Sequence, residues 1–158
     1  MNLAVIMELP LVVIDVQRGG PATGLPTKSE QTDLLQCLFG RNGETPMPVI
    51  AATSPADCFE SAYAACKIAL EHMTPVVFMS DAYIANGSEA FKLPNLAEYP
   101  AINPPYVPES MKGTWTPYMR DERDVRYWAV PGREGFAHIL GGLEKDSKTG
   151  AISTNPEN

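Results

Sequence analysis

Three short apolar runs limit the fold of this 158-residue chain more than any other feature. The first, residues 11–16, is continuous and rich in β-branched side chains, and it lacks the apolar–polar alternation of a half-exposed strand. Continuous runs of this kind form strands of parallel sheets that are covered on both faces. Residues 48–52 and 75–80 have the same character. The sequence therefore predicts three strands of a largely buried parallel sheet.

A first helix is predicted between the first two strands. Thr27-Lys28-Ser29-Glu30 fits a capping box, in which the Thr27 hydroxyl and the Glu30 carboxylate satisfy the first free backbone amides. Apolar residues then recur at helical spacing over residues 34–39, and Gly40 ends the helix.

A second helix is predicted between the second and third strands. Ser54 is a good N-cap, Pro55 suits the first helical position, and Asp57 complements the helix dipole. The helix continues to about His72. Its small and apolar residues share one face, which indicates close packing against a sheet; they are Cys58, Ala62, Ala65, Cys66, Ala69 and Met73.

The alternation of strands and helices defines the fold class. Strand, helix, strand, helix, strand at this spacing is typical of right-handed βαβ crossovers, so residues 1–92 are predicted to form an open, mainly parallel α/β sheet with flanking helices. Residues 93–158 form a proline-rich extension and tail of the same domain, either an ordered but irregular arm or a segment that contacts a partner. Residues 2–9 resemble the end of a helix without its start, so we expect an incomplete sheet with apolar surface exposed.

Charge and hydropathy exclude two classes of partner. The net charge of −7, from 19 acidic and 12 basic residues, works against nonspecific binding to nucleic acid. The longest apolar stretch, residues 3–16, is interrupted by Glu8 and Pro10 and is too short to span a membrane. No basic leader with a signal-peptide cleavage site is visible. A cytoplasmic protein is expected.

The cysteines and the aromatic-rich tail favour structural roles. Cys37, Cys58 and Cys66 leave one thiol unpaired in any disulfide scheme and include no C-x-x-C, so all three are predicted to be small buried side chains. The charged residues 120–126 are flanked by aromatic side chains and carry both signs of charge. This pattern favours a solvated loop anchored by aromatics over a surface that stacks on bases.

The loop after the first strand carries the most functional information. In open α/β sheets, ligands lie beside the carboxyl ends of the strands. Glycines allow the backbone to turn tightly and approach a ligand, the following helix would offer free amides, and Arg18 offers a planar fork for a carboxylate. The loop, with glycines at Gly19, Gly20 and Gly24, is therefore a candidate anion site.

Two other interpretations of this loop stay open on the residues alone. Gly19 to Gly24 matches the first half of a phosphate-binding P-loop, but Leu25 and Pro26 stand where that motif needs lysine and a hydroxyl residue. Without the lysine that reaches the outer phosphates, a nucleoside-triphosphate site is disfavoured. The second alternative is a glycine turn without any ligand.

Residues 16–28, followed by Glu30, Gln31 and Asp33, resemble the alpha-subunit motif of 2-oxoacid:acceptor oxidoreductases, and the 2-oxoglutarate type more than the pyruvate type. The similarity covers nearly the whole chain. It continues through residues 40–44, 73–76, 80–81, 85–87, 128–132 and 141–146.

This resemblance implies the pyrimidine-type domain of a thiamine diphosphate enzyme. Such a domain packs against a beta subunit that holds the diphosphate, Mg²⁺ and a [4Fe–4S] cluster. The implied reaction is oxidative decarboxylation of a 2-oxoacid to its acyl-coenzyme A, with electrons passed to ferredoxin. By motif position, Arg18 would face the substrate carboxylate, with Thr23 and Lys28 on the same wall. The glycines Gly19, Gly20 and Gly24 would lie against the cofactor.

The chain also departs from the family pattern. The family's alpha subunit begins earlier, with a substrate-contacting Tyr-Pro-Ile-Thr-Pro stretch and a glutamate that activates the aminopyrimidine, and neither is present. Glu8 does not match that glutamate. No catalytic residue or metal ligand is therefore assigned, and the chain is expected to be inactive alone. The alternative is a noncatalytic α/β binding or scaffold module.

Overall fold

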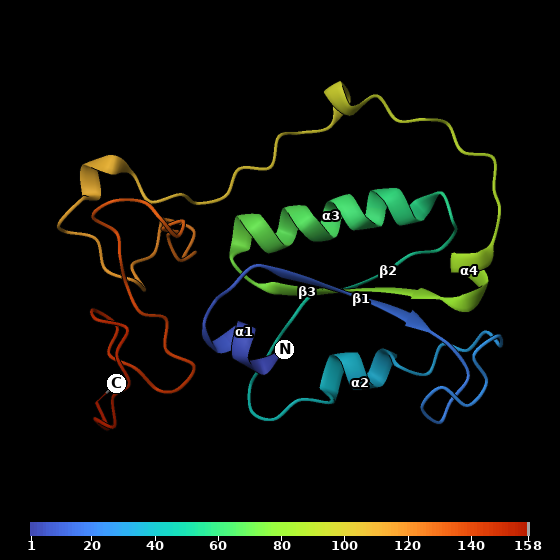
Figure 1. Cartoon of the computed structure of the whole chain (residues 1–158), viewed down its shortest axis with the longest axis horizontal. Helices are drawn as coiled ribbons and strands as arrows, with labels where there is room; N and C mark the ends of the chain where they lie inside the picture. Colours follow the sequence, from blue (N-terminus) through green and yellow to red (C-terminus); the bar gives the residue numbers. More distant parts are fainter. Residues whose placement is uncertain (158) are drawn as a thin grey trace.

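A three-stranded parallel sheet forms the centre of the computed structural model, which describes residues 1–157 (Figure 1). β3 (Pro75–Asp81) lies between β1 (Leu11–Gln17) and β2 (Val49–Ala51), and both outer strands run parallel to it. The predicted strands and fold class are thus confirmed, while Asn158 lies outside the described residues. The other elements are α1 (Asn2–Ile6), α2 (Leu34–Phe39), α3 (Asp57–His72), α4 (Ala82–Asn86) and the 3₁₀ turns η1 (Leu96–Glu98) and η2 (Glu109–Met111).

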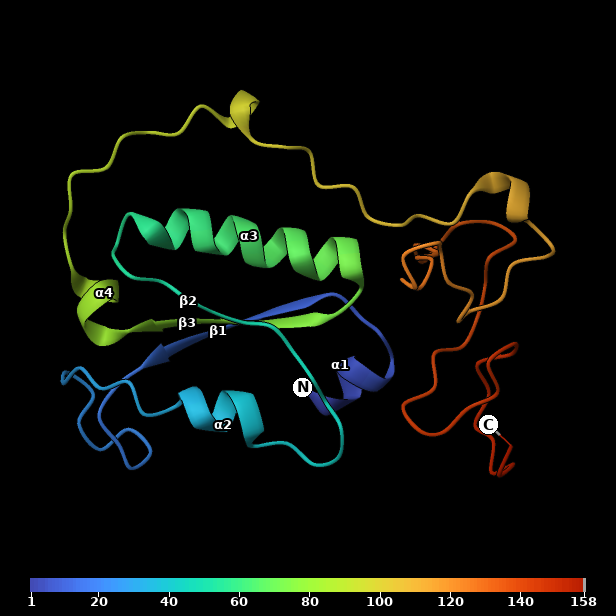
Figure 2. The ribbon, with the colours of Figure 1, turned by 180° about the vertical axis from the view of Figure 1, so that it is seen from behind.

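The sheet lies between two helical layers. α3 covers one face, and α2 lies on the other side (Figures 1 and 2). All seven residues of β3 are buried. Val76 and Phe78 pack with Ala65 and Ala69 of α3, whose short side chains let the helix approach the sheet closely. Burial on both faces explains why the run was continuously apolar.

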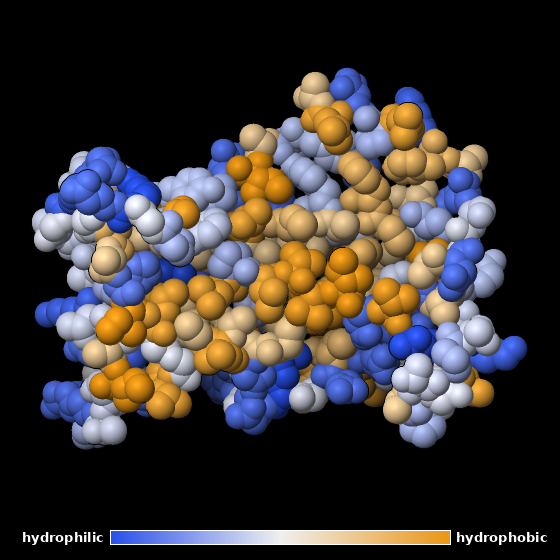
Figure 3. All heavy atoms as spheres, in the orientation of Figure 1, coloured by the Kyte–Doolittle hydropathy of each residue, from blue (hydrophilic) through white to orange (hydrophobic). Residues whose placement is uncertain are grey.

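β1 is paired on one side only within residues 1–157. It bonds to β3 along its whole length. Three of its apolar side chains remain exposed, with Leu11 at 41%, Ile14 at 60% and Val16 at 46%. Figure 3 shows apolar side chains gathered over the middle of this face of the molecule. The exposure expected from an incomplete sheet is therefore present.

α2 begins later than the capping box predicted. Its first residue is Leu34, and Thr27 does not cap it. The Glu30 carboxylate accepts from the Gly20 amide at 3.1 Å instead of reaching back to Thr27. Because residues 27–33 are bonded to the loop and to the sheet, they cannot also form the first helical turn. Gly40 ends the helix, as predicted.

α3 matches its predicted span more closely. The Ser54 hydroxyl accepts from the Asp57 amide at 3.2 Å, and the helix ends at His72. Its fully buried face is formed by Ser61, Ala65 and Ala69. The prediction for Cys66 was wrong, because one residue past Ala65 is about 100° around the helix, and this thiol is exposed. The other thiols, Cys37 and Cys58, are half-buried and also free.

The segment after α4 is irregular, as predicted, and lies along α3 of the same chain (Figures 1 and 2). The ring centroids of Tyr63 and Tyr99 are 4.9 Å apart, and those of Phe59 and Tyr99 are 5.7 Å apart. The Asn103 amide donates to the carboxylate of Glu71 at 2.9 Å. This arm is therefore held by its own helix.

The rest of the extension packs beside α1, at the amino ends of the strands (Figure 1). Arg126 is 1% exposed and donates to the backbone oxygen of Glu8 at 3.0 Å. Lys145 Nζ donates to the Ile6 oxygen at 2.8 Å, and Arg120 forms an ion pair with the Glu8 carboxylate. The prediction of a solvated loop is thus wrong for Arg126, whose guanidinium satisfies backbone carbonyls in the interior.

Candidate functional site

A long loop, residues 18–33, leaves the carboxyl end of β1 and leads into α2 (Figure 1). Since the strands are parallel, β2 and β3 end at the same edge of the sheet. The predicted position of the loop is confirmed. Sheets of this kind bind ligands at that edge.

The loop is folded tightly on itself. The Gly19 amide donates to the Lys28 oxygen at 2.9 Å, and the Leu25 amide donates to the Gly19 oxygen at 3.0 Å. A Cβ at Gly19 would lie 2.8 Å from the Leu25 Cβ, and one at Gly24 would lie 2.9 Å from the Pro21 oxygen. Both glycines are therefore required by close approach within the loop.

The glycine amides are already occupied. Gly19 donates to Lys28, Gly20 donates to the Glu30 carboxylate, and Gly24 donates to the Pro21 oxygen at 3.0 Å. α2 begins only at Leu34 and has six residues, so it adds no free helix end beside the glycines. In this conformation, the three glycine amides are not free to bind an anion.

Two cationic side chains of the loop have no hydrogen-bond or ion-pair partner within residues 1–157. Arg18 and Lys28 are exposed, as is Thr23. Because Lys28 is bonded through its backbone to Gly19, the two cationic side chains start from neighbouring points of the loop. Within residues 1–157, Arg18 donates no hydrogen bond to a protein oxygen. All five other arginines do, and they are Arg41, Arg120, Arg123, Arg126 and Arg133.

Hydrogen bonds that the sequence did not predict fix the base of the loop. Gln17, 6% exposed, donates to the Ser80 oxygen at 3.3 Å and accepts from the Asp33 amide at 3.0 Å. Gln31 donates to the Asp81 carboxylate at 2.7 Å. Each bond joins residues far apart in the chain, so no local signal could have revealed it.

Asp81 holds two elements at once. Its Oδ1 accepts from the amides of Tyr83 and Ile84, which caps α4, while its Oδ2 accepts from Gln31. The hydrogen bond from Ile84, followed by that from Gln31, holds the pKa of this carboxyl below its usual value. Its position after a buried strand and before a helix was the available sequence signal for a cap.

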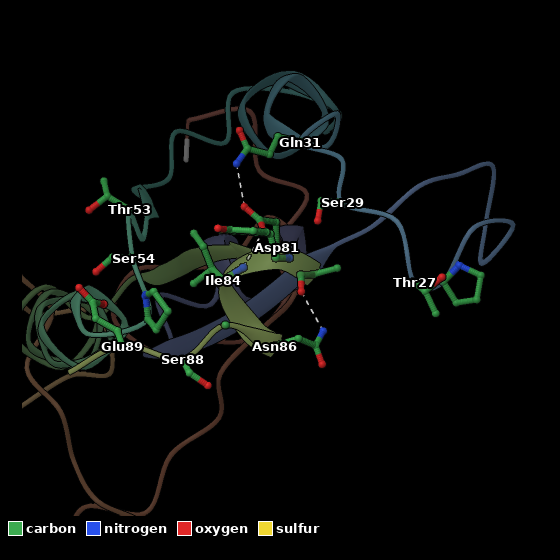
Figure 4. Close-up of a pocket in the computed structure, with 15 residues that line it drawn as sticks. Thr27, Ser29, Gln31, Thr53, Ser54, Asp81, Ile84, Asn86, Ser88 and Glu89 are labelled. Atoms are coloured by element: carbon green, nitrogen blue, oxygen red, sulfur yellow. Dashed lines mark hydrogen bonds between the residues drawn. The ribbon is translucent and has the colours of Figure 1, made fainter. Parts of the chain in front are cut away.

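A hollow of about 820 Å³ lies beside the loop at this edge of the sheet (Figure 4). Its walls come from the return of the loop, from the β2–α3 turn and from α4. Polar side chains dominate the lining and include Thr27, Ser29, Gln31, Thr53, Ser54, Asp81, Asn86, Ser88 and Glu89. None of the six predicted site residues lines this hollow, although Lys28 lies between two residues that do. Of the six, only Gly19 is buried.

Residues 1–157 contain no group of three or more histidine, cysteine, aspartate or glutamate side chains arranged to hold a metal ion.

Over the same residues, no helix is both long and apolar enough to cross a lipid bilayer.

The sequence model of one protein family matches residues 1–148; its description is pyruvate flavodoxin/ferredoxin oxidoreductase, thiamine diphosphate-binding. The chain belongs to this family, which confirms the resemblance first seen in residues 16–28.

Individual relatives narrow the similarity to enzymes of 2-oxoglutarate. The chain is 50% identical over its full length to 2-oxoglutarate oxidoreductase subunit KorA of Mycobacterium tuberculosis, and covers 24% of that protein. It is 31% identical to 2-oxoglutarate synthase subunit KorA of Methanothermobacter marburgensis, with 98% of the chain and 40% of the relative aligned. The chain thus spans well under half of these relatives.

A solved structure agrees in fold. The chain superposes on the 2-oxoglutarate:ferredoxin oxidoreductase from Magnetococcus marinus, solved with 2-oxoglutarate, coenzyme A and succinyl-CoA bound, with a TM-score of 0.86 and 33% sequence identity. The match covers 99% of this chain and 27% of that one.

Proposed function

We propose that the chain is a segment of the alpha subunit of a 2-oxoglutarate:ferredoxin oxidoreductase and forms the wall that faces the substrate. In the complete enzyme, 2-oxoglutarate, coenzyme A and two oxidised ferredoxins give succinyl-coenzyme A, carbon dioxide, two reduced ferredoxins and a proton. The main observation behind the proposal is that Arg18 and Lys28, at the edge where sheets of this kind bind ligands, have no partner within residues 1–157. The names of the similar proteins support the choice of 2-oxoglutarate.

In this proposal, Arg18 grips the substrate. Its planar guanidinium forms two parallel hydrogen bonds to the carboxylate beside the keto group, and so fixes the direction of the bond that is cleaved. 2-Oxoglutarate has a second carboxylate, and Lys28 supplies a second cation from a neighbouring point of the loop. Thr23 adds a hydroxyl to the same wall. Two free cations suit a dicarboxylate better than pyruvate, which carries one carboxylate.

The residues of this loop are better suited to contacting thiamine diphosphate than to binding its diphosphate group. Thiamine supplies the electron sink for decarboxylation when bound. The glycine amides of the loop already have partners, so the diphosphate and its Mg²⁺ are assigned to the beta subunit in this proposal. Of the three glycines, Gly20 and Gly24 are exposed and would contact the cofactor through their backbone, whereas Gly19 is buried against Leu25.

The remaining groups are also assigned to partners. A [4Fe–4S] cluster needs four thiolates, whereas this chain has three cysteines, all of them free. The cluster is therefore placed in the beta subunit, which passes electrons to ferredoxin. The exposed apolar side chains of β1 support the proposal that this chain functions only within a larger assembly. Free thiols suit a reducing compartment, so we place the enzyme in the cytoplasm.

Replacement of Arg18 tests the proposal directly. The complete alpha subunit carrying Arg18→Ala or Arg18→Lys would be combined with the beta subunit, and succinyl-coenzyme A formation measured with an artificial electron acceptor. Loss of a charge-assisted contact is worth roughly 1.5–3 kcal/mol, so kcat/KM for 2-oxoglutarate should fall at least about tenfold in both variants.

Arg123→Ala provides a matched control. Arg123 is also an exposed arginine, but it lies in the extension and pairs with Asp121 at 2.8 Å, so its loss should leave kcat/KM unchanged. An unchanged kcat/KM in Arg18→Ala would remove this arginine from the site. A noncatalytic scaffold would be indicated if the wild-type pair showed no saturable, mutually dependent binding of thiamine diphosphate and 2-oxoglutarate.

A further inference from the structure

We infer that Gln17 is a positioning residue: it fixes the base of the loop so that Arg18 is presented at a defined place and angle. The inference deepens the proposed function and rests on it. Gln17 itself is buried and touches no substrate in this proposal.

The environments of these two neighbouring residues differ sharply. Gln17 is the last residue of β1 and is 6% exposed, whereas Arg18 is the first residue of the loop and is exposed. A fixed side chain at Gln17 therefore fixes the backbone from which Arg18 projects. The Arg18 guanidinium has no hydrogen-bond partner within residues 1–157, so its own contacts do not fix its position.

The Gln17 carboxamide is used at both ends. Its Nε2 donates to the oxygen of Ser80 in β3, and its Oε1 accepts from the amide of Asp33, the last residue of the loop. One side chain thus joins the first strand, the central strand and both ends of residues 18–33. Because the two ends of this 16-residue loop are joined, the loop has much less conformational entropy than an open one.

A second link acts beside the first. Gln31 donates to the Asp81 carboxylate at 2.7 Å, and Gln17, Gln31 and Asp81 line one cavity of about 420 Å³ under the loop. Gln31 is more exposed than Gln17, so water competes for its hydrogen bond. Gln17 is the more buried of the two anchors and makes two hydrogen bonds to the backbone, whereas Gln31 makes one hydrogen bond to a side chain.

The chemistry at this position requires a carboxamide. Methionine has a similar length but provides neither the donor for Ser80 nor the acceptor for Asp33. Glutamate could accept from Asp33, but its second oxygen would face the Ser80 carbonyl oxygen in a buried position near two other carboxylates, those of Asp33 and Asp81. Gln17→Met is the cleaner test because it adds no charge.

A double-mutant cycle separates positioning from general damage to the fold. In the complete enzyme, Gln17→Met should lower kcat/KM for 2-oxoglutarate roughly tenfold, because a misplaced arginine no longer forms both hydrogen bonds. In an Arg18→Ala background, the same change should lower kcat/KM less than about twofold, since there is no guanidinium left to misplace. Equal losses in both backgrounds would overturn the inference, because they indicate a purely structural effect.

Amide hydrogen exchange provides a second readout that does not depend on turnover. In Gln17→Met, peptides from residues 19–32 should exchange at least about tenfold faster, while those from α3 should be unchanged. The control is Gln36→Met, at an exposed glutamine of α2 whose side chain has no hydrogen bond within residues 1–157; it should change neither exchange nor kcat/KM.

The two proposals fail in different ways. A wild-type enzyme without turnover that depends on 2-oxoglutarate would contradict the proposed function. Unchanged exchange of residues 19–32 in Gln17→Met would overturn the role of Gln17, whether or not the enzyme is active. Faster exchange in the loop together with a strong dependence on Arg18 would support both.

Discussion

The two ends of the sheet use their positive charges in opposite ways. At the amino end, Arg120, Arg126 and Lys145 are all bonded to α1 or to the turn that follows it. At the carboxyl end, Arg18 and Lys28 project from the loop without a partner in the described chain. The first group stabilises the fold, and the second is free to bind. Position in the sheet, more than residue type, therefore separates the arginines that hold the fold from the one proposed to bind substrate.

The largest expected effect is on stability at the amino end. Arg126 donates to the backbone oxygens of Glu8, Pro117 and Tyr127. Arg126→Met keeps much of the apolar stem but leaves these buried acceptors unpaired, so the free energy of unfolding should fall by about 3 kcal/mol. Urea unfolding of the isolated chain would measure this change.

Amide exchange would then show which region is lost. In Arg126→Met, residues 106–157 should lose protection while β3 keeps it, because the extension is attached to the sheet mainly by such polar bonds. A change smaller than about 1 kcal/mol, or equal loss of protection in both regions, would contradict the division between the two ends. Arg123→Met, at an exposed position, is the control.

A smaller effect is expected at Asp81, which belongs to the carboxyl end but acts structurally. Asp81→Ala removes the cap of α4 and the partner of Gln31, and should lower the free energy of unfolding by about 1 kcal/mol at pH 7. Glu44→Ala, at an exposed carboxylate without a hydrogen bond in the described chain, should have almost no effect.

The contribution of Asp81 should also depend on pH. The pKa of this carboxyl is lowered in the folded chain from its ordinary value of 3.8. The stabilisation is therefore present above about pH 4 and is lost as the pH falls through the lowered pKa. The difference in unfolding free energy between wild type and Asp81→Ala should shrink over that range. A difference that stayed constant down to pH 2 would show that the carboxylate charge does not matter.

The smallest expected effect is on the stability of the loop variants. Arg18→Ala and Lys28→Ala should change the free energy of unfolding by less than about 0.5 kcal/mol, because both side chains are exposed and unpaired. Thermal unfolding of the isolated chain would test this. A loss above about 1 kcal/mol for either variant would mean that the cation holds the loop, and the contrast between the two ends would disappear.

The parts of the fold that could be predicted are those with local signals. Continuous apolar runs identified β1, β2 and β3, and Ser54 with Asp57 marked the start of α3 to within a turn. The start of α2 was mispredicted because Glu30 binds Gly20, which lies ten residues away, and not its neighbour. A capping pattern does not form a helix cap when its side chains bind residues that are distant in the sequence.

The candidate site was predictable only in part, for the same physical reason. The loop sequence indicated Arg18 and its place at the edge of the sheet. It also suggested free amides at the start of a helix right after the loop, but α2 begins only at Leu34. Gln17 and Gln31 belong to the family motif, but their role could not be predicted from the sequence. A glutamine is informative only when its partners are known, and here these include Ser80 and Asp81. The burial of Arg126 depends likewise on Glu8, 118 residues away.

The strand order has a consequence for synthesis of the chain. β3 is the central strand, yet it comes last of the three in the sequence, and within residues 1–157 β1 and β2 pair with no other strand. During synthesis, residues 75–81, the strand that β1 and β2 share as a partner in this sheet, emerge after both of them. The backbone edges of β1 and β2 that pair with β3 stay open during that interval, and open strand edges favour aggregation of a growing chain. The order of the strands thus creates a window in which a chaperone would have most to protect.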